Sequence, residues 1–320
     1  MTVMVVRERS ALLYGAIEGG GTKFVCAIGT SSRDVWDSVV LPTASAASTL
    51  AACVEFFSTA EQKYGRIAAF GFACFGPIDL RTHEPTHGQM LATPKPGWSR
   101  VDLLKPLRSR FSVPILIDTD VSAAALAEWQ LGAGRGLGSI AYVTVGTGIG
   151  GGVAPHDLTT RRLMHPEMGH IFVRRDARER DFPGVCPFHG DCLEGLASGT
   201  AIQARWRCQL EALPPHHEAW SMIGGYLGQL AAAIALMVSV ERVVFGGGVM
   251  ANGQLLPHIR AAAANALQGY LEPLGQPGAL DTYICAPELG SGAGIAGAFL
   301  LAERALASGG RGQPPGGTSN

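Results

Sequence analysis

Short apolar runs alternate with longer amphipathic or alanine-rich segments along the chain. Residues 67–75 and 113–117 are apolar runs that end in glycine, proline or polar residues, and they predict buried strands. The helical spacing of apolar positions over residues 46–64 predicts an amphipathic helix, and the apolar segment 218–240 predicts a longer one. Because strands and helices alternate, the chain is predicted to be an α/β protein.

The other expected elements are short. Strands are expected at residues 243–245 and 282–285, and loops at residues 81–100 and 155–195. The tail, residues 308–320, is rich in glycine and polar residues and is expected to be disordered. Further helices are expected at residues 101–110, 121–129, 197–212 and 254–271, and from the small-residue segment 290–297 to about 307.

Two segments repeat one pattern of strand, glycine-rich turn and strand. They are residues 11–29, ALLYGAIEGGGTKFVCAIG, and residues 139–153, SIAYVTVGTGIGGGV, and their likeness suggests two similar halves. Glycine is enriched in the chain, with 43 residues among 320. Because clustered glycines suit tight turns and close approach of the backbone to a ligand, both turns are candidate binding sites.

The tips of these hairpins are predicted to bind phosphate. Glycine and threonine leave backbone N–H groups unobstructed, and such concave backbone segments bind anions. Tight turns without a ligand are the alternative. The glycines of the second hairpin match a dinucleotide fingerprint as a string, but Val153, Ala154 and Pro155 cannot start the required helix, which disfavours a nicotinamide oxidoreductase. The candidate residues are Gly20, Gly21, Thr22 and Lys23 at one tip and Thr144, Gly146, Thr147 and Gly148 at the other.

Soft metal ligands gather in one short segment. Cys186, His189 and Cys192 have two-residue spacings, and His170 lies 15 intervening residues before Cys186. Such spacings let side chains converge on one tetrahedral ion, so a zinc site is predicted, with coincidence in a loop as the alternative. Four protein ligands indicate a structural zinc that folds the loop, because a catalytic zinc keeps an open position.

Four carboxylates are candidates for chemistry on a substrate. Asp118 and Asp120 lie where a predicted strand runs into a helix, and the carboxyl ends of strands face the ligand in open α/β sheets. A carboxylate there can accept a hydroxyl proton, although Asp is also a common helix cap. Glu167 and Glu194 flank the zinc segment and can accept hydrogen bonds from a polyol, with solvated loop charge as the alternative.

Composition and charge exclude several classes of protein. Apolar residues make up 47% of the chain and charged residues 16%, which suits a sizeable core and not a disordered chain. The net charge of −1 provides no strong basic field, so binding to nucleic acid is not expected. At 320 residues the prior expectation is two domains.

The cysteines and the apolar segments point to a soluble, cytoplasmic protein. Seven cysteines are an odd number, which argues against a secreted disulfide scaffold. The first ten residues do not read as a signal peptide, and the longest apolar stretch, residues 230–240, is too short for a membrane span of about 20 residues. Core packing is expected for the cysteines outside the zinc segment, Cys26, Cys53, Cys74, Cys208 and Cys285.

Together these segments resemble the ROK family of sugar kinases and sugar-responsive repressors, and most closely its bacterial fructokinases. GAIEGGGTKFVCAIG resembles the phosphate-1 motif, with Glu18 where most members have Asp, and VTVGTGIGGG resembles phosphate-2. IDTDVSAAALAE resembles the segment of the catalytic Asp, with Ser122 where relatives commonly have Asn. HPEMGH and CPFHGDCLEGLASG resemble the zinc and sugar region, and VFGGGVM and LGSGAGIAGA the nucleotide side. The resemblance covers roughly residues 12–305.

The resemblance implies a role for each matching residue. It makes Asp120 the general base, places Glu167, His170 and Glu194 beside the sugar, and makes His170 a zinc ligand with Cys186, His189 and Cys192. The nucleotide side consists of Gly20, Gly21, Thr22, Lys23, Thr147, Gly195, Gly246, Gly247, Gly248 and Met250.

The implied fold is the two-domain, actin-like or ribonuclease-H-like ATPase fold, with an interdomain cleft. The N-terminal domain would comprise residues 1–120 and about 290–307, and the C-terminal domain residues 121–289. ATP with Mg²⁺ would lie in the cleft, with its phosphates on the hairpin tips, and the protein would be a homodimer with structural zinc. Closure of the domains would exclude water from the γ-phosphate.

The expected activity is ATP-dependent phosphorylation of D-fructose to fructose 6-phosphate. Phosphorylation of mannose or glucose is the first alternative, because the hexoses differ in few contacts. A repressor of the same family is disfavoured, because only about 13 residues precede the first hairpin where a DNA-binding helix-turn-helix is required. A non-catalytic sugar-binding protein is disfavoured by the presence of Asp120 and Thr147.

Overall fold

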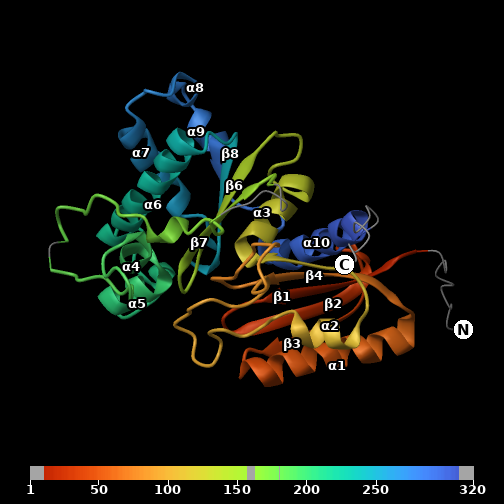
Figure 1. The fold of residues 1–320 in the computed structure, drawn as a ribbon. Helices are drawn as coiled ribbons and strands as arrows, with labels where there is room; N and C mark the ends of the chain where they lie inside the picture. The colour runs from red at the N-terminus through yellow and green to blue at the C-terminus, as the bar shows by residue number, and fades with distance from the viewer. Residues whose placement is uncertain (1–10, 157–162, 180, 310–320) are drawn as a thin grey trace, which may run out of the picture. The chain divides into compact units, whose positions relative to one another are not determined.

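The computed structural model describes residues 11–156, 163–179 and 181–309 (Figure 1). These residues form two compact units. One unit takes the chain up to Ala123 together with the residues from Gly294 onward, and the other comprises Ala124–Ala293. The tail that was predicted to be disordered lies outside the described residues from 310 onward, and residues 308 and 309 are the end of a helix.

The first unit is built on a five-stranded sheet in the order β3-β2-β1-β4-β5. β1 pairs antiparallel with β2 and parallel with β4, so the predicted hairpin joins a parallel part of the sheet to an antiparallel edge. Both β4 and β5 are parallel to β1, and their carboxyl ends lie at the edge where the hairpin turns. The strands are β1 (Leu13–Gly19), β2 (Lys23–Ser31), β3 (Asp34–Pro42), β4 (Ile67–Cys74) and β5 (Ile115–Thr119).

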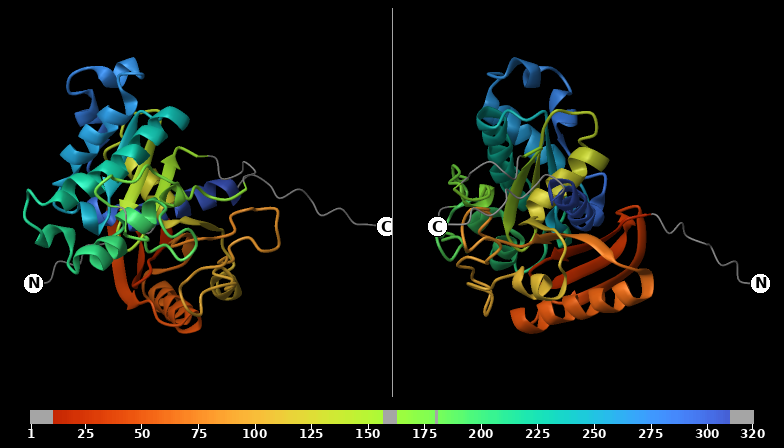
Figure 2. Two further views of the ribbon diagram at one scale, coloured as in Figure 1. Left: turned by 90° about the vertical axis from the view of Figure 1, so that its left-hand side faces the viewer. Right: turned by 45° about the vertical axis from the view of Figure 1, so that its right-hand side comes forward.

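Helices cover both faces of this sheet (Figure 2). α1 (Ala46–Tyr64) and α2 (Lys105–Arg110) lie on one face, where Phe57 of α1 contacts Phe70 of β4 with ring centroids 4.9 Å apart. α10 (Ala293–Gly309) lies on the other face. There Gly71 allows the helix to come close, because a Cβ at Gly71 would lie 1.8 Å from the carbonyl oxygen of Ala298.

The second unit repeats the hairpin arrangement of the first. Its four-stranded sheet has the order β7-β6-β8-β9, and β6 pairs antiparallel with β7 and parallel with β8. This match to β1, β2 and β4 confirms the prediction of two similar halves. The strands are β6 (Ile140–Val145), β7 (Ile149–Ala154), β8 (Arg242–Gly246) and β9 (Ile284–Cys285).

The core of the second unit is built around α6 (Glu218–Met237), which packs with α7 (Leu255–Leu267) and one side of the sheet. α6 is long and apolar enough to cross a membrane, with a mean hydropathy of 1.3, but 67% of that stretch is buried inside the protein. It is therefore accounted for as a core helix. Apolar residues of α3 (Asp120–Leu131) from Ala124 onward pack with Ile140 and Tyr142 of the sheet.

Several predicted boundaries were wrong, and local contacts explain most of them. The helix expected at 101–110 begins only at Lys105, because the side chain of Asp102 accepts the N–H groups of Leu104 and Lys105 before it. The helix expected at 197–212 is interrupted, because Ser198 caps a new helix and Arg207 ends it with φ +61°. The pieces are α4 (Leu193–Ala197), α5 (Gly199–Trp206) and the short 3-10 turn Leu210–Ala212.

Other elements were absent from the sequence prediction. β3 is an edge strand whose side chains are all exposed or half-buried, and polar residues at 37 and 38 interrupt its apolar positions. The short helices α8 (Glu272–Gly275) and α9 (Ala279–Tyr283) also lie in a region with little apolar periodicity. The helix expected to reach residue 271 ends at Leu267, because Gln268 adopts a left-handed conformation with φ +48°.

Candidate active site and metal centre

Two aspartates lie where β5 ends and α3 begins, and only one of them is accessible. Asp118 is 1% exposed and its carboxylate accepts the N–H of Thr119 at 2.7 Å, and it lies within electrostatic reach of Arg304 in α10. Asp120 is half-buried, and its Oδ1 accepts the N–H of Val121 at 2.9 Å. The second oxygen of Asp120 can therefore receive a proton from a bound hydroxyl.

The carboxylates of Asp120 and Glu18 have raised pKa values. Burial raises the pKa of Asp120 to about 6, and the charge of Asp118 adds to the effect. Burial also raises the pKa of Glu18 to about 7, and the charge of Asp120 raises it further, whereas Lys23 and the N–H of Ile295 lower it. The two groups therefore form a closely spaced acidic pair that titrates near neutral pH.

Glycine is required beside Glu18. A Cβ at Gly294, next to the start of α10, would lie 2.3 Å from Oε1 of Glu18. The N–H of Ile295 meets the same carboxylate. The motif that resembles the nucleotide side thus holds Glu18 at a helix N-terminus, where a negative charge is favoured.

Ser122 acts in starting the helix. Its N–H donates to Oγ1 of Thr119 at 3.2 Å, and the two hydroxyls are hydrogen-bonded at 2.9 Å. Ser122 is 4% exposed, so its hydroxyl is turned into the protein. Where relatives commonly have Asn, this chain therefore has a residue committed to the start of α3.

At the tip of the first hairpin, two N–H groups have no acceptor in the described part of the protein, whereas the carbonyls are hydrogen-bonded within the protein. Within the described residues, the backbone N–H groups of Gly21 and Thr22 donate to no protein group. The carbonyls of the tip each accept a hydrogen bond: that of Gly20 from Oγ1 of Thr43 at 2.8 Å and that of Gly21 from Nζ of Lys95 at 2.6 Å. With Lys23 nearby, this tip suits an anion.

In the second hairpin, too, protein donors hold the carbonyls of the tip. The carbonyl of Gly146 accepts the N–H of Gly199 at 2.7 Å, and that of Thr147 accepts Oγ1 of Thr200 at 2.7 Å. A Cβ at Gly199 would lie 2.8 Å from the carbonyl oxygen of Gly146, so the start of α5 must be glycine to reach the hairpin. The sequence analysis did not identify Gly199 and Thr200 as site residues, because both fall inside the longer helix expected at residues 197–212.

A cavity of about 870 Å³ opens beside the second hairpin, within the usual range for a small-molecule site. Its wall includes the predicted residues Thr147 and Gly248. Polar side chains that could contact a nucleobase come from α5 and the segment after it. They are Gln203, Arg207, Gln209 and Glu211.

Of the predicted nucleotide residues in the second unit, four do not line this cavity. Met250 is buried at 5% exposure. Gly246 and Gly247 shape the loop after β8, because Cβ atoms there would lie 2.3 Å from the hydroxyl of Tyr142 and 2.4 Å from the carbonyl oxygen of Val145. Gly195 packs against the zinc segment, as described below.

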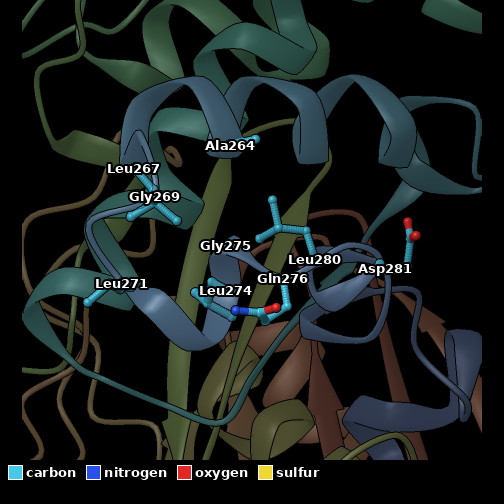
Figure 3. Close-up of a pocket in the computed structure, with 10 residues that line it drawn as sticks. Ala264, Leu267, Gly269, Leu271, Leu274, Gly275, Gln276, Leu280 and Asp281 are labelled. Atoms are coloured by element: carbon cyan, nitrogen blue, oxygen red, sulfur yellow. The ribbon is translucent and has the colours of Figure 1, made fainter.

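A second cavity, of about 260 Å³, lies in the same unit between α7 and the segment of α8 and α9 (Figure 3). Leucine side chains dominate its wall, with Gln276 and Asp281 as polar groups. It has neither a glycine hairpin nor a cationic side chain in its wall, so a polyphosphate fits the larger cavity better.

The four predicted metal ligands converge. One ligand atom from each of His170, Cys186, His189 and Cys192 lies within 4.8 Å of all the others. Sγ of Cys186 is 3.7 Å from Nδ1 of both histidines, and Sγ of Cys192 is 3.5 Å from Nδ1 of His170. Zinc bond lengths of about 2.3 Å to sulfur and 2.0 Å to nitrogen place tetrahedral ligands about 3.5 Å apart. The four side chains therefore fit a zinc ion.

Glycines allow the tight turns and close packing of the loop that carries Cys186, His189 and Cys192. Gly184 and Gly190 adopt φ +81° and +68°, which side chains rarely allow. A Cβ at Gly195 would lie 1.9 Å from the carbonyl oxygen of Gly190, and its own carbonyl accepts the N–H of Val185 at 3.0 Å. Gly195 thus fastens the loop to α4.

Glu194 connects the metal centre to the second hairpin. Its Oε1 lies 4.0 Å from Nε2 of His170, and its Oε2 accepts the N–H of Ile149 at 2.9 Å. Because Nδ1 of His170 faces the sulfurs, its Nε2 and the Glu194 carboxylate remain for a polar ligand. Glu167 lies one turn before His170, 39% exposed, with Oε1 3.5 Å from Nδ1 of His165.

Comparison with known proteins identifies the family of the chain. The sequence profile of the ROK family matches residues 14–305. The chain is 44% identical over 293 residues to a fructokinase from Zymomonas mobilis, covering 91% of this chain and 96% of that protein. It is 38% identical over 295 residues to a fructokinase from Pediococcus pentosaceus, covering 92% and 99%.

The fold is shared with a solved structure. A ROK hexokinase from Thermus thermophilus superposes with a TM-score of 0.74 at 26% identity, over 93% of this chain and 100% of that one. With the repeated hairpin-and-sheet arrangement, this likeness confirms the predicted α/β, actin-like fold class.

Proposed function

Because the chain belongs to the ROK family, we propose that it is an ATP-dependent fructokinase, which transfers the γ-phosphoryl group of ATP to the 6-hydroxyl of D-fructose. The observation that carries this proposal is the similarity to two fructokinases over more than nine-tenths of their length and of this chain. The accessible Asp120 and the two N–H-lined hairpins provide the chemistry that the reaction needs.

Asp120 acts as the general base. Phosphoryl transfer needs a nucleophile whose proton leaves as the new O–P bond forms, and a positioned carboxylate accepts it. Burial has raised the pKa of Asp120 to about 6, so it is a stronger base than an exposed aspartate and is still ionised at pH 7. Asp118 cannot take this role, because it is turned into the protein.

The phosphates of ATP bind the hairpin tips. The unpaired N–H groups of Gly21 and Thr22 and the side chain of Lys23 provide donors for the first tip, and Thr147 and Gly148 provide them for the second. Mg²⁺ bound with ATP would neutralise phosphate charge, and the carboxylate of Glu18 offers hard oxygen ligands that suit it. The nucleoside occupies the larger cavity, with Gly248 in its wall.

The sugar binds beside the zinc centre. Glu167, His170 and Glu194 offer two carboxylates and an imidazole nitrogen to its hydroxyls. A zinc ion held by His170, Cys186, His189 and Cys192 would be structural, because these four side chains would fill its tetrahedral positions and leave none open.

We also propose that the protein is a homodimer and that it is cytoplasmic. Light scattering of the purified protein tests whether it is a dimer.

The pH dependence of the reaction should reveal the acidic pair. As the pH falls through about 7 to 6, Glu18 and Asp120 take up protons, the base is lost, and kcat/KM is expected to fall tenfold per pH unit below about 6. The Glu18→Gln substitution should leave the limb of Asp120 near pH 6, because Glu18 has already taken up its proton in the range where Asp120 titrates. A profile that stays flat down to pH 5 would contradict the assignment of the base.

The preference among hexoses tests the substrate. A buried polar group left unpaired by the wrong sugar costs about 1–3 kcal/mol, or about one to two decades in kcat/KM. We expect fructose to be the best substrate, mannose weaker because its hydroxyls only partly mimic fructose, and glucose weaker still. The measurement is kcat/KM for the three sugars at saturating MgATP. Glucose exceeding fructose would replace the proposal with the second candidate, a glucokinase of the same family.

A further inference from the structure

We propose that Lys95 and Thr43 are positioning residues for phosphoryl transfer, which hold the first hairpin with its N–H groups turned toward the phosphate. This inference rests on the proposed kinase function for its substrate, and on contacts within the first unit for its geometry. Both residues come from outside the motif: Lys95 is 74 residues and Thr43 is 23 residues from the glycine that it contacts.

The geometry follows from the planar trans peptide. In each peptide unit the C=O of one residue and the N–H of the next point in opposite directions. Nζ of Lys95 holds the carbonyl of Gly21, so the N–H of Thr22 points the other way. Oγ1 of Thr43 holds the carbonyl of Gly20, which turns the N–H of Gly21 away in the same manner. These are the two N–H groups that donate to no protein group among the described residues.

We call the contacts of Lys95 and Thr43 with the two carbonyls the lock. The hairpin needs them because glycine does not fix the orientation of its own peptide planes. A Cβ built on Gly21 would meet nothing within 4 Å, so no packing opposes rotation there. A flipped Gly21–Thr22 peptide would present a carbonyl oxygen to the phosphate in place of a donor. The contacts of Lys95 and Thr43 oppose that flip before the nucleotide binds.

The lock itself is rigidly anchored. Trp98, three residues after Lys95, is fully buried, and its ring lies 5.4 Å from that of Phe24 and 5.2 Å from that of Phe75. Its Nε1 donates to the carbonyl of Ala44 at 3.1 Å, next to Thr43. One buried aromatic residue therefore fixes the segments that carry both locking side chains.

The second hairpin provides an independent parallel. There the carbonyls of Gly146 and Thr147 are held by the N–H of Gly199 and Oγ1 of Thr200. The peptide order is the same as in the first hairpin, but the donors differ in kind. Two hairpins whose corresponding carbonyls are held by unrelated donors, three side chains and one backbone N–H, indicate that the orientation of the peptides is the shared requirement.

Steady-state kinetics of four variants tests the lock. Lys95→Met removes the ammonium, Thr43→Val removes the hydroxyl, Lys95→Arg keeps a cationic donor, and Lys105→Met is the matched control on α2. We expect Lys95→Met and Thr43→Val each to lower kcat/KM for MgATP by about 10²-fold, as loss of an oriented donor does, with KM for fructose within about twofold. Lys95→Arg should recover at least tenfold of the loss, and Lys105→Met should match the unaltered protein.

The double variant distinguishes a lock from a direct contact. If both residues hold one hairpin, their effects combine to less than the product of the single losses. Wild-type kinetics in Lys95→Met, fully multiplicative losses, or a loss in Lys95→Met with none in Thr43→Val would overturn the inference. The last result would mean that the ammonium acts on the phosphate itself.

A binding measurement separates this inference from the proposed function. Inorganic pyrophosphate is titrated into the ¹⁵N-labelled full chain while the amide resonances of Gly21 and Thr22 are followed. We expect saturable shifts that are lost in Lys95→Met and kept in Lys105→Met. Those shifts without phosphorylation of any hexose would refute the kinase and support the lock, whereas an active kinase whose Lys95→Met amides respond normally would refute the lock alone.

Discussion

Replacing Asp120 by Asn is expected to lower kcat by about 10²–10⁴-fold, the range for loss of a general base. The amide keeps the size of the side chain and can still accept the N–H of Val121, but it cannot accept the proton of the sugar hydroxyl. The KM for ATP should change little, because the cavity proposed for the nucleoside is lined by residues of the other unit. Steady-state kinetics with fructose and MgATP measure both constants.

The matched control is Asp118→Asn, and it should show the opposite signature. Asp118 is fully buried within electrostatic reach of Arg304, so its replacement is expected to cost stability, about 1–3 kcal/mol, with kcat near that of the unaltered protein. Urea unfolding and kcat are measured for both variants. Near-normal turnover in Asp120→Asn would assign the proton transfer to another group.

Loss of a zinc ligand is expected to have the largest effect on stability. Cys192→Ser should reduce the zinc content from one ion per chain to near zero and lower the free energy of unfolding by about 4–5 kcal/mol or more, as loss of a structural metal does. Activity should fall with it, because His170 is both a proposed zinc ligand and the neighbour of Glu194. Metal analysis, thermal unfolding and kinetics provide the three readouts.

Cys208→Ser is the control for this substitution. Cys208 lies in the same unit, half exposed and outside the metal cluster, so its replacement should leave zinc content and stability unchanged. Prolonged chelation of the unaltered protein should reproduce the loss of stability seen in Cys192→Ser. Folded, active protein that contains no zinc would contradict the metal centre.

The sequence predicted the parts of the site that are local in the chain. Cys186, His189 and Cys192 lie within seven residues, so their spacing alone indicated a metal, and the glycine hairpins are complete within one turn each. The turn from strand to helix at Asp120 could also be predicted from the sequence. What separated Asp120 from Asp118 was burial: Asp118 is 1% exposed and within electrostatic reach of Arg304 in α10, which could not be read from the segment itself.

The parts that escaped prediction depend on contacts between distant segments. Lys95 and Thr43 look like ordinary loop residues until the fold brings them to the hairpin. Gly199 and Thr200 were concealed in a segment expected to be a continuous helix, because the cap at Ser198 is confirmed only by its bond to the N–H of Ala201. Gly195, Gly246 and Gly247 are needed for close packing, which motif resemblance does not distinguish from ligand contact.

The most direct test of the account is to identify the product of the purified protein with MgATP and D-fructose. Phosphorus NMR of the reaction mixture should show fructose 6-phosphate and ADP formed in equal amounts, with neither formed by Asp120→Asn under the same conditions. ADP release that does not depend on any hexose, or a phosphorylated product that Asp120→Asn makes at the same rate, would contradict the account.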